Sequence, residues 1–137
     1  MREQTSPDLD SALVLGMAST AIPFARSRGE EAERWLRILR LHGEAGAALQ
    51  ALGVSEAPLE APTVHDEEAM AASGEDVVTR VGDVAAAAAG RRQAHCFTTI
   101  DVLLAVIEVY GQDFNDVLRA HGTDRQEVLE RLQPMAA

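Results

Sequence analysis

The stretch TTIDVLLAVIEVYGQDFNDVLRAHG, from Thr98 to Gly122, decides the fold of this chain. It begins with two threonines suited to cap a helix, and Asp101 is favourable in the first turn of that helix. Apolar residues fill most of the run to Tyr110, and Gly111 ends it. A shorter amphipathic segment then leads to Gly122. The pattern predicts a long apolar helix, a glycine turn and a short helix.

The run DVLLAVIEVY within this stretch has a second interpretation, as a buried strand. Val and Ile are enriched in strands, and a run of this length fits either structure. The sequence offers no second strand with which it would pair. We therefore expect a helix here.

The same order of features occurs earlier, in EEAERWLRILRLHGEAGAALQALG at residues 30–53. The two copies correspond at a shift of 68 residues, and after one inserted residue at a shift of 69. The corresponding positions are Trp35-Leu36 and Leu103-Leu104, Ile38-Leu39 and Val106-Ile107, Gly43 and Gly111, Leu49 and Leu118, and Gly53 and Gly122. A repeated unit of this kind constrains architecture more than local propensity does.

The repeat resembles the N-terminal docking domain of Clp-family ATPases, in which a long helix leads to a GTEHLLLALL-like segment and then to a vLxxLGvd-like segment. In the second copy, VTRVGDVAAAAAGRRQAHCF, TTIDVLLAVI and DVLRAHGTD take these three places. In the first copy, LDSALVLGMASTA, EEAERWLRIL and AALQALGV take them. The resemblance covers roughly residues 8 to 132.

The resemblance implies an all-α fold, a single bundle of about eight helices made of two tandem four-helix repeats with pseudo-twofold symmetry. It also implies a non-enzymatic module, without cofactor or metal, that docks substrates, adaptors or small cyclic peptides for a hexameric unfoldase. The glutamates by which some members bind phosphorylated arginine are replaced here by Ala32 and Ile100. The nearest acids are Glu31, Glu33 and Asp101, the last in place of a histidine. Binding of phosphorylated arginine is therefore doubtful, because a neutral side chain cannot pair a guanidinium.

The chain divides into a first repeat at 8–53, an acidic linker at 54–75 that contains Pro58 and Pro62, and a second repeat at 76–132, all within one domain of 137 residues. Ser6 or Asp8 is expected to cap the first helix, and Pro23 to break or kink it. The helix that begins near residue 76 is expected to end at Gly90.

Composition excludes several classes of partner. A net charge of −10 opposes binding to nucleic acid or to an anionic membrane surface. No run approaches the roughly 20 apolar residues that span a bilayer, and the N-terminal residues do not resemble a signal peptide. Cys96 is the only cysteine, so no internal disulfide forms and the cytoplasm is the expected location. The chain contains no GxxxxGK[ST] loop and so no ATPase motif.

The first hypothesis is therefore a protein- or peptide-binding module that acts as an adaptor, a substrate-recognition protein or a ligand-sequestering protein in Clp-type proteolysis. Its partner would be a Clp ATPase, or the substrates or adaptors of one. The alternative is a helical homo-oligomeric structural or regulatory protein unrelated to Clp. The oligomeric state and the identity of the ligand are open at this point.

Four apolar residues head the first long helix of each repeat, where family members dock ligands near the pseudo-twofold axis: Leu9, Leu13, Val77 and Val81. Three acids are candidates for a polar rim around them: Asp8, Glu75 and Asp76. The same four apolar residues are equally explained as core positions.

The remaining conspicuous residues have structural explanations. A small enzyme that uses His95 and Cys96 would rest on that dipeptide alone, since no metal-binding or catalytic spacing accompanies it. The acidic run His65 to Glu68 lacks the glycine and the oxygen spacing of a calcium loop. Trp35 and Phe97 are expected in the core, and Arg91-Arg92 complements a helix end.

Overall fold

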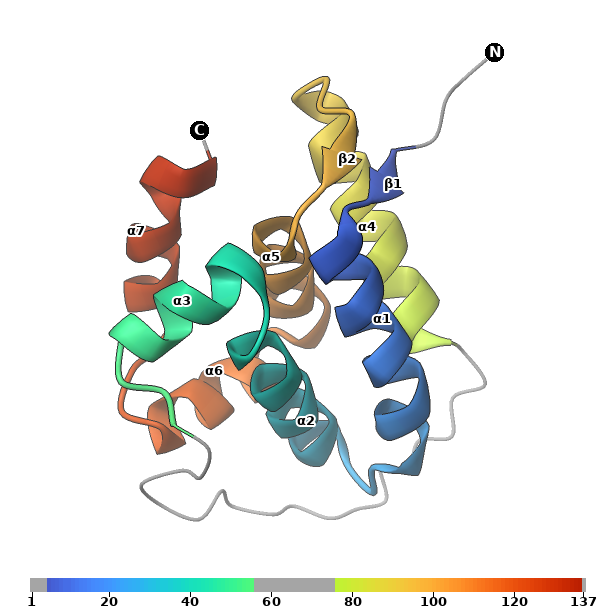
Figure 1. Ribbon diagram of the computed structural model, residues 1–137. Helices are drawn as coiled ribbons and strands as arrows, with labels where there is room; N and C mark the ends of the chain where they lie inside the picture. Colours follow the sequence, from blue (N-terminus) through green and yellow to red (C-terminus); the bar gives the residue numbers. More distant parts are fainter. Residues whose placement is uncertain (1–4, 56–75, 137) are drawn as a thin grey trace.

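The computed structural model describes residues 5–55 and 76–136, and the fold is all-α (Figure 1). Seven α-helices lie in these residues: α1 (Leu9–Ala21), α2 (Arg28–Arg40), α3 (Gly43–Ala51), α4 (Val77–Arg91), α5 (Thr99–Tyr110), α6 (Gln112–Ala120) and α7 (Arg125–Ala136). A 3₁₀ turn, η1 (Ile22–Phe24), follows α1 at Pro23, and two short strands are present, β1 (Ser6–Pro7) and β2 (Cys96–Phe97). The helical interpretation of residues 101–110 is confirmed.

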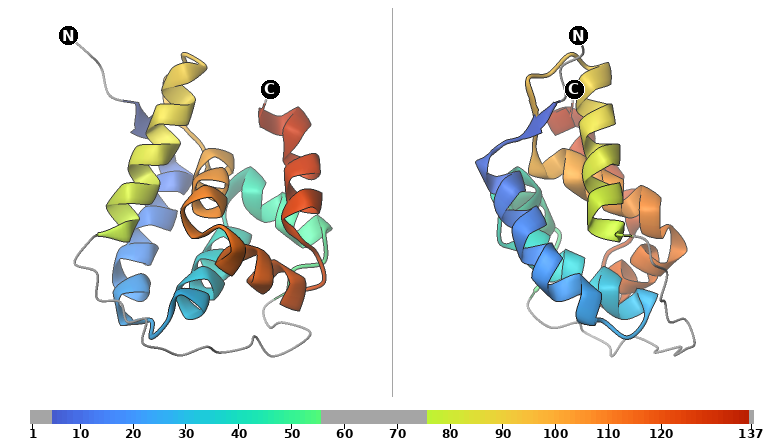
Figure 2. Two further views of the ribbon diagram at one scale, coloured as in Figure 1. Left: turned by 180° about the vertical axis from the view of Figure 1, so that it is seen from behind. Right: turned by 90° about the vertical axis from the view of Figure 1, so that its right-hand side faces the viewer.

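Helix α5 is the central element. It contacts each of the other six helices, which surround it in Figures 1 and 2. Glu108 is its only exposed residue. A helix that is apolar on nearly all sides is expected to be buried in this way.

Helices α1 and α4 lie side by side and run in opposite directions (Figures 1 and 2). Two close approaches fix their register. A Cβ atom at Gly82 would lie 3.7 Å from Leu15 Cδ1, and one at Gly90 would lie 3.5 Å from Thr5 Oγ1. The first residues of α1 and of α4 are therefore at opposite ends of the pair.

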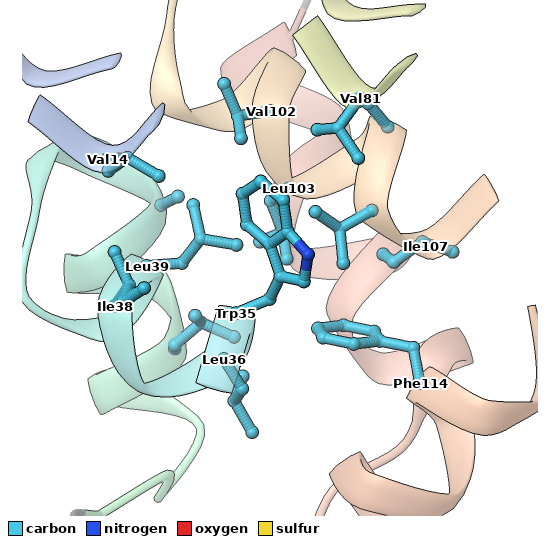
Figure 3. Packing of buried hydrophobic residues seen from close by; sticks show 14 of the residues in the cluster. Val14, Trp35, Leu36, Ile38, Leu39, Val81, Val102, Leu103, Ile107 and Phe114 are labelled. Atoms are coloured by element: carbon cyan, nitrogen blue, oxygen red, sulfur yellow. The ribbon is translucent and has the colours of Figure 1, made fainter. Parts of the chain in front are cut away.

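The core is built around Trp35, which is fully buried between side chains of α2, α5 and α6, including Leu103 and Phe114 (Figure 3). Its indole Nε1 donates a hydrogen bond to the Tyr110 hydroxyl at 3.0 Å. Phe97 is also buried, so the core prediction for both Trp35 and Phe97 is confirmed. Leu41, the C-cap residue of α2, is 60% exposed.

The helix caps follow the sequence closely. The Asp8 carboxylate accepts the Ser11 N–H at 2.8 Å, and Asp76 accepts those of Val78 and Thr79. Thr98 and Asp101 form a capping box at the start of α5. These are local interactions. The sequence predicted the caps at Asp8 and Thr98, each as one of two alternatives, but not the cap at Asp76.

Two features differ from the sequence expectation. Helix α4 does not stop at Gly90 but continues to Arg91, and the left-handed residue that follows it is Gln93, with φ of 62°. Strands β1 and β2 pair in parallel, with Ser6 opposite Cys96 and Pro7 opposite Phe97. A two-residue strand has no hydrophobic period, so the sequence carries no signal for it.

Among the described residues no helix has both the length and the apolar character needed to cross a bilayer.

Candidate interaction surface on helix α1

Helix α1 turns its smaller side chains toward the protein. Ser11, Val14 and Ala18 are fully buried, and the Ser11 hydroxyl donates to the Phe97 carbonyl at 3.3 Å. Leu9, Leu13 and Met17 are separated by four residues and so share one helix face, which projects outward, whereas Leu15 is half-buried against the core.

Three residues at this spacing form an apolar stripe on the outer face, which we call the α1 stripe: Leu9, Leu13 and Met17. Their exposed fractions are 76%, 47% and 42% respectively. Three of the six large hydrophobic residues exposed in the described chain therefore lie on one face of one helix.

Helix α1 itself carries little charge. Asp10 is the only charged residue within α1, and Gly16 on the exposed side has no atom within 4 Å of the position of a Cβ. The hydroxyls of Ser19 and Thr20 donate to the backbone carbonyls of Leu15 and Met17. The outer face of a helix in a soluble protein usually carries charged residues, and an apolar patch rimmed by polar groups is typical of an interaction site.

The structure separates the four apolar site candidates. Leu9 and Leu13 are exposed, Val77 is half-buried, and Val81 is fully buried in the core (Figure 3). Because α1 and α4 are antiparallel, Leu9 and Val77 lie at opposite ends of the helix pair. Val81 is therefore a core residue, which was one of the two roles that the sequence allowed for it. Whether Leu9 and Leu13 bind a ligand stays a prediction.

Met17 was not among the candidate site residues. Its signal was present in the sequence, as the third member of the spacing Leu9, Leu13, Met17 in a segment without charge after Asp10. What the sequence did not reveal was which side of α1 faces water.

The candidate rim acids have defined local roles. Asp8 caps α1, and its backbone N–H donates to the Phe97 carbonyl at 3.0 Å. Asp76 caps α4 and also accepts the Thr79 hydroxyl at 2.7 Å. This side-chain hydrogen bond, together with the Thr79 and Val78 N–H groups, lowers the pKa of Asp76. Glu75 and the run His65 to Glu68 lie outside the described residues.

The acids nearest to Ala32 and Ile100 are held by internal partners. Asp101 is 1% exposed, forms two hydrogen bonds with the Arg92 guanidinium at 2.6 and 3.0 Å, and accepts the Thr98 N–H. The hydrogen bonding of the Arg92 guanidinium to the Asp101 carboxylate raises the pKa of Arg92. Arg92, expected only to complement a helix end, thus acts chiefly as the partner of a buried carboxylate.

Glu33 occupies the corresponding place in α2, at the shift of 68 residues. It is 7% exposed, its two oxygens lie 3.1 Å from His121 Nε2, and Oε2 accepts from Arg37 Nε at 2.7 Å. Glu31 accepts a hydrogen bond from the Tyr110 hydroxyl at 2.7 Å. Burial and this carboxylate raise the pKa of the Tyr110 phenol.

The aligned positions Ala32 and Ile100 are buried. The acids around them therefore join helices within the protein and do not form an open anionic pocket.

His95 is exposed and Cys96 is half-buried in β2. Within the described residues no group of three or more His, Cys, Asp and Glu side chains is placed to hold a metal ion. Among the features described so far, the α1 stripe is the one that presents exposed side chains for recognition.

Comparison of the chain with models of protein families, with curated proteins and with solved structures gives no match.

Proposed function

We propose that this protein is a non-enzymatic module that binds proteins or peptides through the α1 stripe. The observation that carries the proposal is the outward projection of Leu9, Leu13 and Met17 from a helix whose only charge is Asp10. A soluble protein gains nothing from exposing these side chains unless another surface covers them, because burial of apolar area is favourable.

The size of the α1 stripe sets the expected affinity. Covering the exposed parts of three such side chains contributes roughly 3–5 kcal/mol, since complete burial of one contributes about 1.5–3 kcal/mol. A micromolar complex requires about 8 kcal/mol net of the cost of association. The α1 stripe therefore supports weak, reversible binding that neighbouring polar contacts strengthen.

We further propose that residues 8–53 and 76–132 are two repeats of the Clp docking type, related by pseudo-twofold symmetry. Beyond the sequence resemblance, equivalent glycines have similar left-handed φ values: 63° at Gly43 and 57° at Gly111, and 97° at Gly53 and 93° at Gly122.

Other backbone features also recur at equivalent positions and support the two-repeat proposal. The N–H of Val54 donates to the Leu49 carbonyl at 3.0 Å, as that of Thr123 does to Leu118 at 3.1 Å. Asp8 and Asp76, separated by the repeat shift, both cap helices.

On this proposal the protein is an adaptor, a substrate-recognition protein or a ligand-sequestering protein in Clp-type proteolysis. Its ligands are apolar segments and not phosphorylated arginine, because Glu33 and Asp101 are already bound to internal cations or histidine.

The test is binding of the full chain to an immobilised set of peptides that tile an unrelated unfolded protein. We expect selective binding to peptides rich in apolar residues, reduced about tenfold by Leu13→Gln. The matched control is Leu129→Gln on α7, where the leucine is 38% exposed. Absence of binding to any peptide would overturn the proposal.

The Clp assignment needs a separate assay. Added protein should change the rate at which a Clp-type ATPase with its peptidase degrades an unfolded substrate, and Leu13→Gln should reduce the change. No effect on degradation would remove the Clp assignment and leave peptide binding intact.

A second candidate function, homo-oligomeric scaffold or regulator, is favoured by the same exposed α1 stripe, since two copies can cover each other's apolar faces. Sedimentation of the protein over a wide range of concentrations distinguishes the two functions. A stable dimer that Leu13→Gln dissociates would favour the scaffold.

A further inference from the structure

We infer that the α1 stripe receives one amphipathic α-helix with basic flanking residues, laid along α1. This inference rests on the proposed function and specifies the chemistry of the partner.

The shape of the α1 stripe fits a single helix. Leu9 to Met17 spans two helical turns, about 12 Å, and the stripe is one residue wide. Ala12 and Gly16 beside it are small and exposed, and Gly16 leaves open space where a side chain would be. Small residues let two helix axes approach closely, so a partner helix can place apolar side chains between Leu9, Leu13 and Met17.

The negative charge near the α1 stripe favours a partner helix with basic residues beside its apolar face. Asp10 is exposed between Leu9 and Leu13 along the chain, and Asp8 lies at the same end of α1. The whole chain carries a net charge of −10. Arg or Lys beside the apolar face of the partner would meet Asp10, whereas an acidic partner would be repelled by the net negative charge of the protein.

The same quantities argue against a second copy of the chain as the occupant. One face of a helix as long as α1 measures about 20 by 10 Å, or roughly 200 Å². A stable dimer buries about 800 Å² on each partner. Two copies would also bring charges of −10 together. A single basic helix does not bring like charges together, and its small contact area suits the weak, reversible binding expected of the α1 stripe.

The experiment uses a synthetic peptide of about 15 residues with leucines on one helical face and arginines on its flanks. Binding of the fluorescent peptide to the full chain is followed by anisotropy at low and at physiological salt. The control peptide has glutamate in place of each arginine. Two pairs of variants accompany it: Leu13→Gln with Leu129→Gln, and Asp10→Asn with Glu108→Gln, since Glu108 is exposed on α5.

We expect the arginine peptide to bind and the glutamate peptide to bind at least about tenfold more weakly. Leu13→Gln should weaken binding about tenfold and Asp10→Asn about threefold, the latter only at low salt. Both control variants should bind as the unmodified protein does. Circular dichroism of each variant checks that the helices remain folded.

Several results would overturn the inference: no binding of the arginine peptide, equal binding of the glutamate peptide, or equal loss with Leu129→Gln. A protein that is already dimeric without peptide, and that Leu13→Gln makes monomeric, would assign the α1 stripe to a second copy instead. If the tiled peptides still bind while the arginine peptide does not, the partner chemistry is wrong and the proposed function stands. If neither binds, both fail.

Discussion

Helices α1 and α4 occupy equivalent places in the proposed repeats but use their apolar residues in opposite ways. At the shift of 68 residues, Leu9, Leu13 and Met17 of α1 correspond to Val77, Val81 and Ala85 of α4. Val81 and Ala85 are fully buried, whereas the three α1 residues are between 42% and 76% exposed. The larger apolar side chains are thus outside and the smaller ones inside, which hydrophobicity alone would not produce.

The cause lies in how the two helices pack. Helix α4 lies against α5 with Val81, Ala85 and Ala89 inward, and helix α1 packs inward through Ser11, Val14 and Ala18. On both helices, the side chains that pack into the core are small. Leu9, Leu13 and Met17 are therefore not part of the buried core, and this comparison predicts that they serve binding.

The largest expected effect comes from placing one charge on each helix. Val81→Asp should lower the free energy of unfolding by about 4 kcal/mol or more, because it buries an unpaired carboxylate. Leu13→Asp should lower it by less than about 1 kcal/mol, because the new charge reaches water. Urea unfolding followed by circular dichroism measures both. Similar losses of unfolding free energy at the two positions would contradict the burial of Val81 and the exposure of Leu13.

Removal of a buried and of an exposed carboxylate should give a smaller difference in the free energy of unfolding, in the same direction. Asp101→Asn takes away the buried partner of Arg92 and should cost about 2 kcal/mol. Asp10→Asn on the exposed face of α1 should change the free energy of unfolding by no more than about 0.5 kcal/mol. The same unfolding assay applies, and a loss at Asp10 as large as that at Asp101 would contradict the assignment of Asp10 to the solvent-exposed face of α1.

Adding a methyl group at Gly16 tests whether this face of α1 is uncovered, with a smaller expected effect on the free energy of unfolding. Gly16→Ala should raise the free energy of unfolding by about 0.8 kcal/mol, since alanine favours the helix and nothing lies within 4 Å of the new atom. Gly82→Ala on α4 is the counterpart, where the methyl would make an ordinary contact with Leu15 at 3.7 Å. A destabilised Gly16→Ala protein would mean that this face is covered.

The smallest expected effect is the loss of stability when Asp76, the N-cap of α4, is protonated at low pH. The pKa of Asp76 is lowered in the folded protein from its ordinary 3.8, first by the Thr79 hydroxyl. The carboxylate therefore contributes stability above that ordinary value, and the contribution is lost as the pH falls through the lowered pKa. The amide signals of Val78 and Thr79 should titrate with a midpoint below 3.8 in nuclear magnetic resonance spectra. A midpoint at or above that value would show that the cap is absent.

The sequence predicted what depends on neighbours along the chain. The helices, the caps at Asp8 and Thr98, and the break at Pro23 follow from short spacings. The outward face of α1 could not be predicted, because Val14 and Ala18 on one side and Leu9 and Leu13 on the other both suit burial.

Contacts that depend on how separate helices and strands pack could not be predicted from the sequence either. The pairing of Asp101 with Arg92, the pairing of Glu33 with His121 and the short β1–β2 pair depend on how the helices and strands pack in three dimensions. Because of these contacts, Glu33 and Asp101 have partners within the protein. The structure was needed to move the candidate site from four residues on two helices to three residues on α1.

The most direct test of the central claim is a nuclear magnetic resonance titration of isotopically labelled full-length protein with the arginine-flanked helical peptide. The account predicts that amide and methyl shifts change at Leu9, Leu13 and Met17 and their neighbours in α1, while Val81 in α4 and Leu129 in α7 remain unchanged. Changes centred on any other surface, or no changes at peptide concentrations that saturate the anisotropy signal, would contradict it.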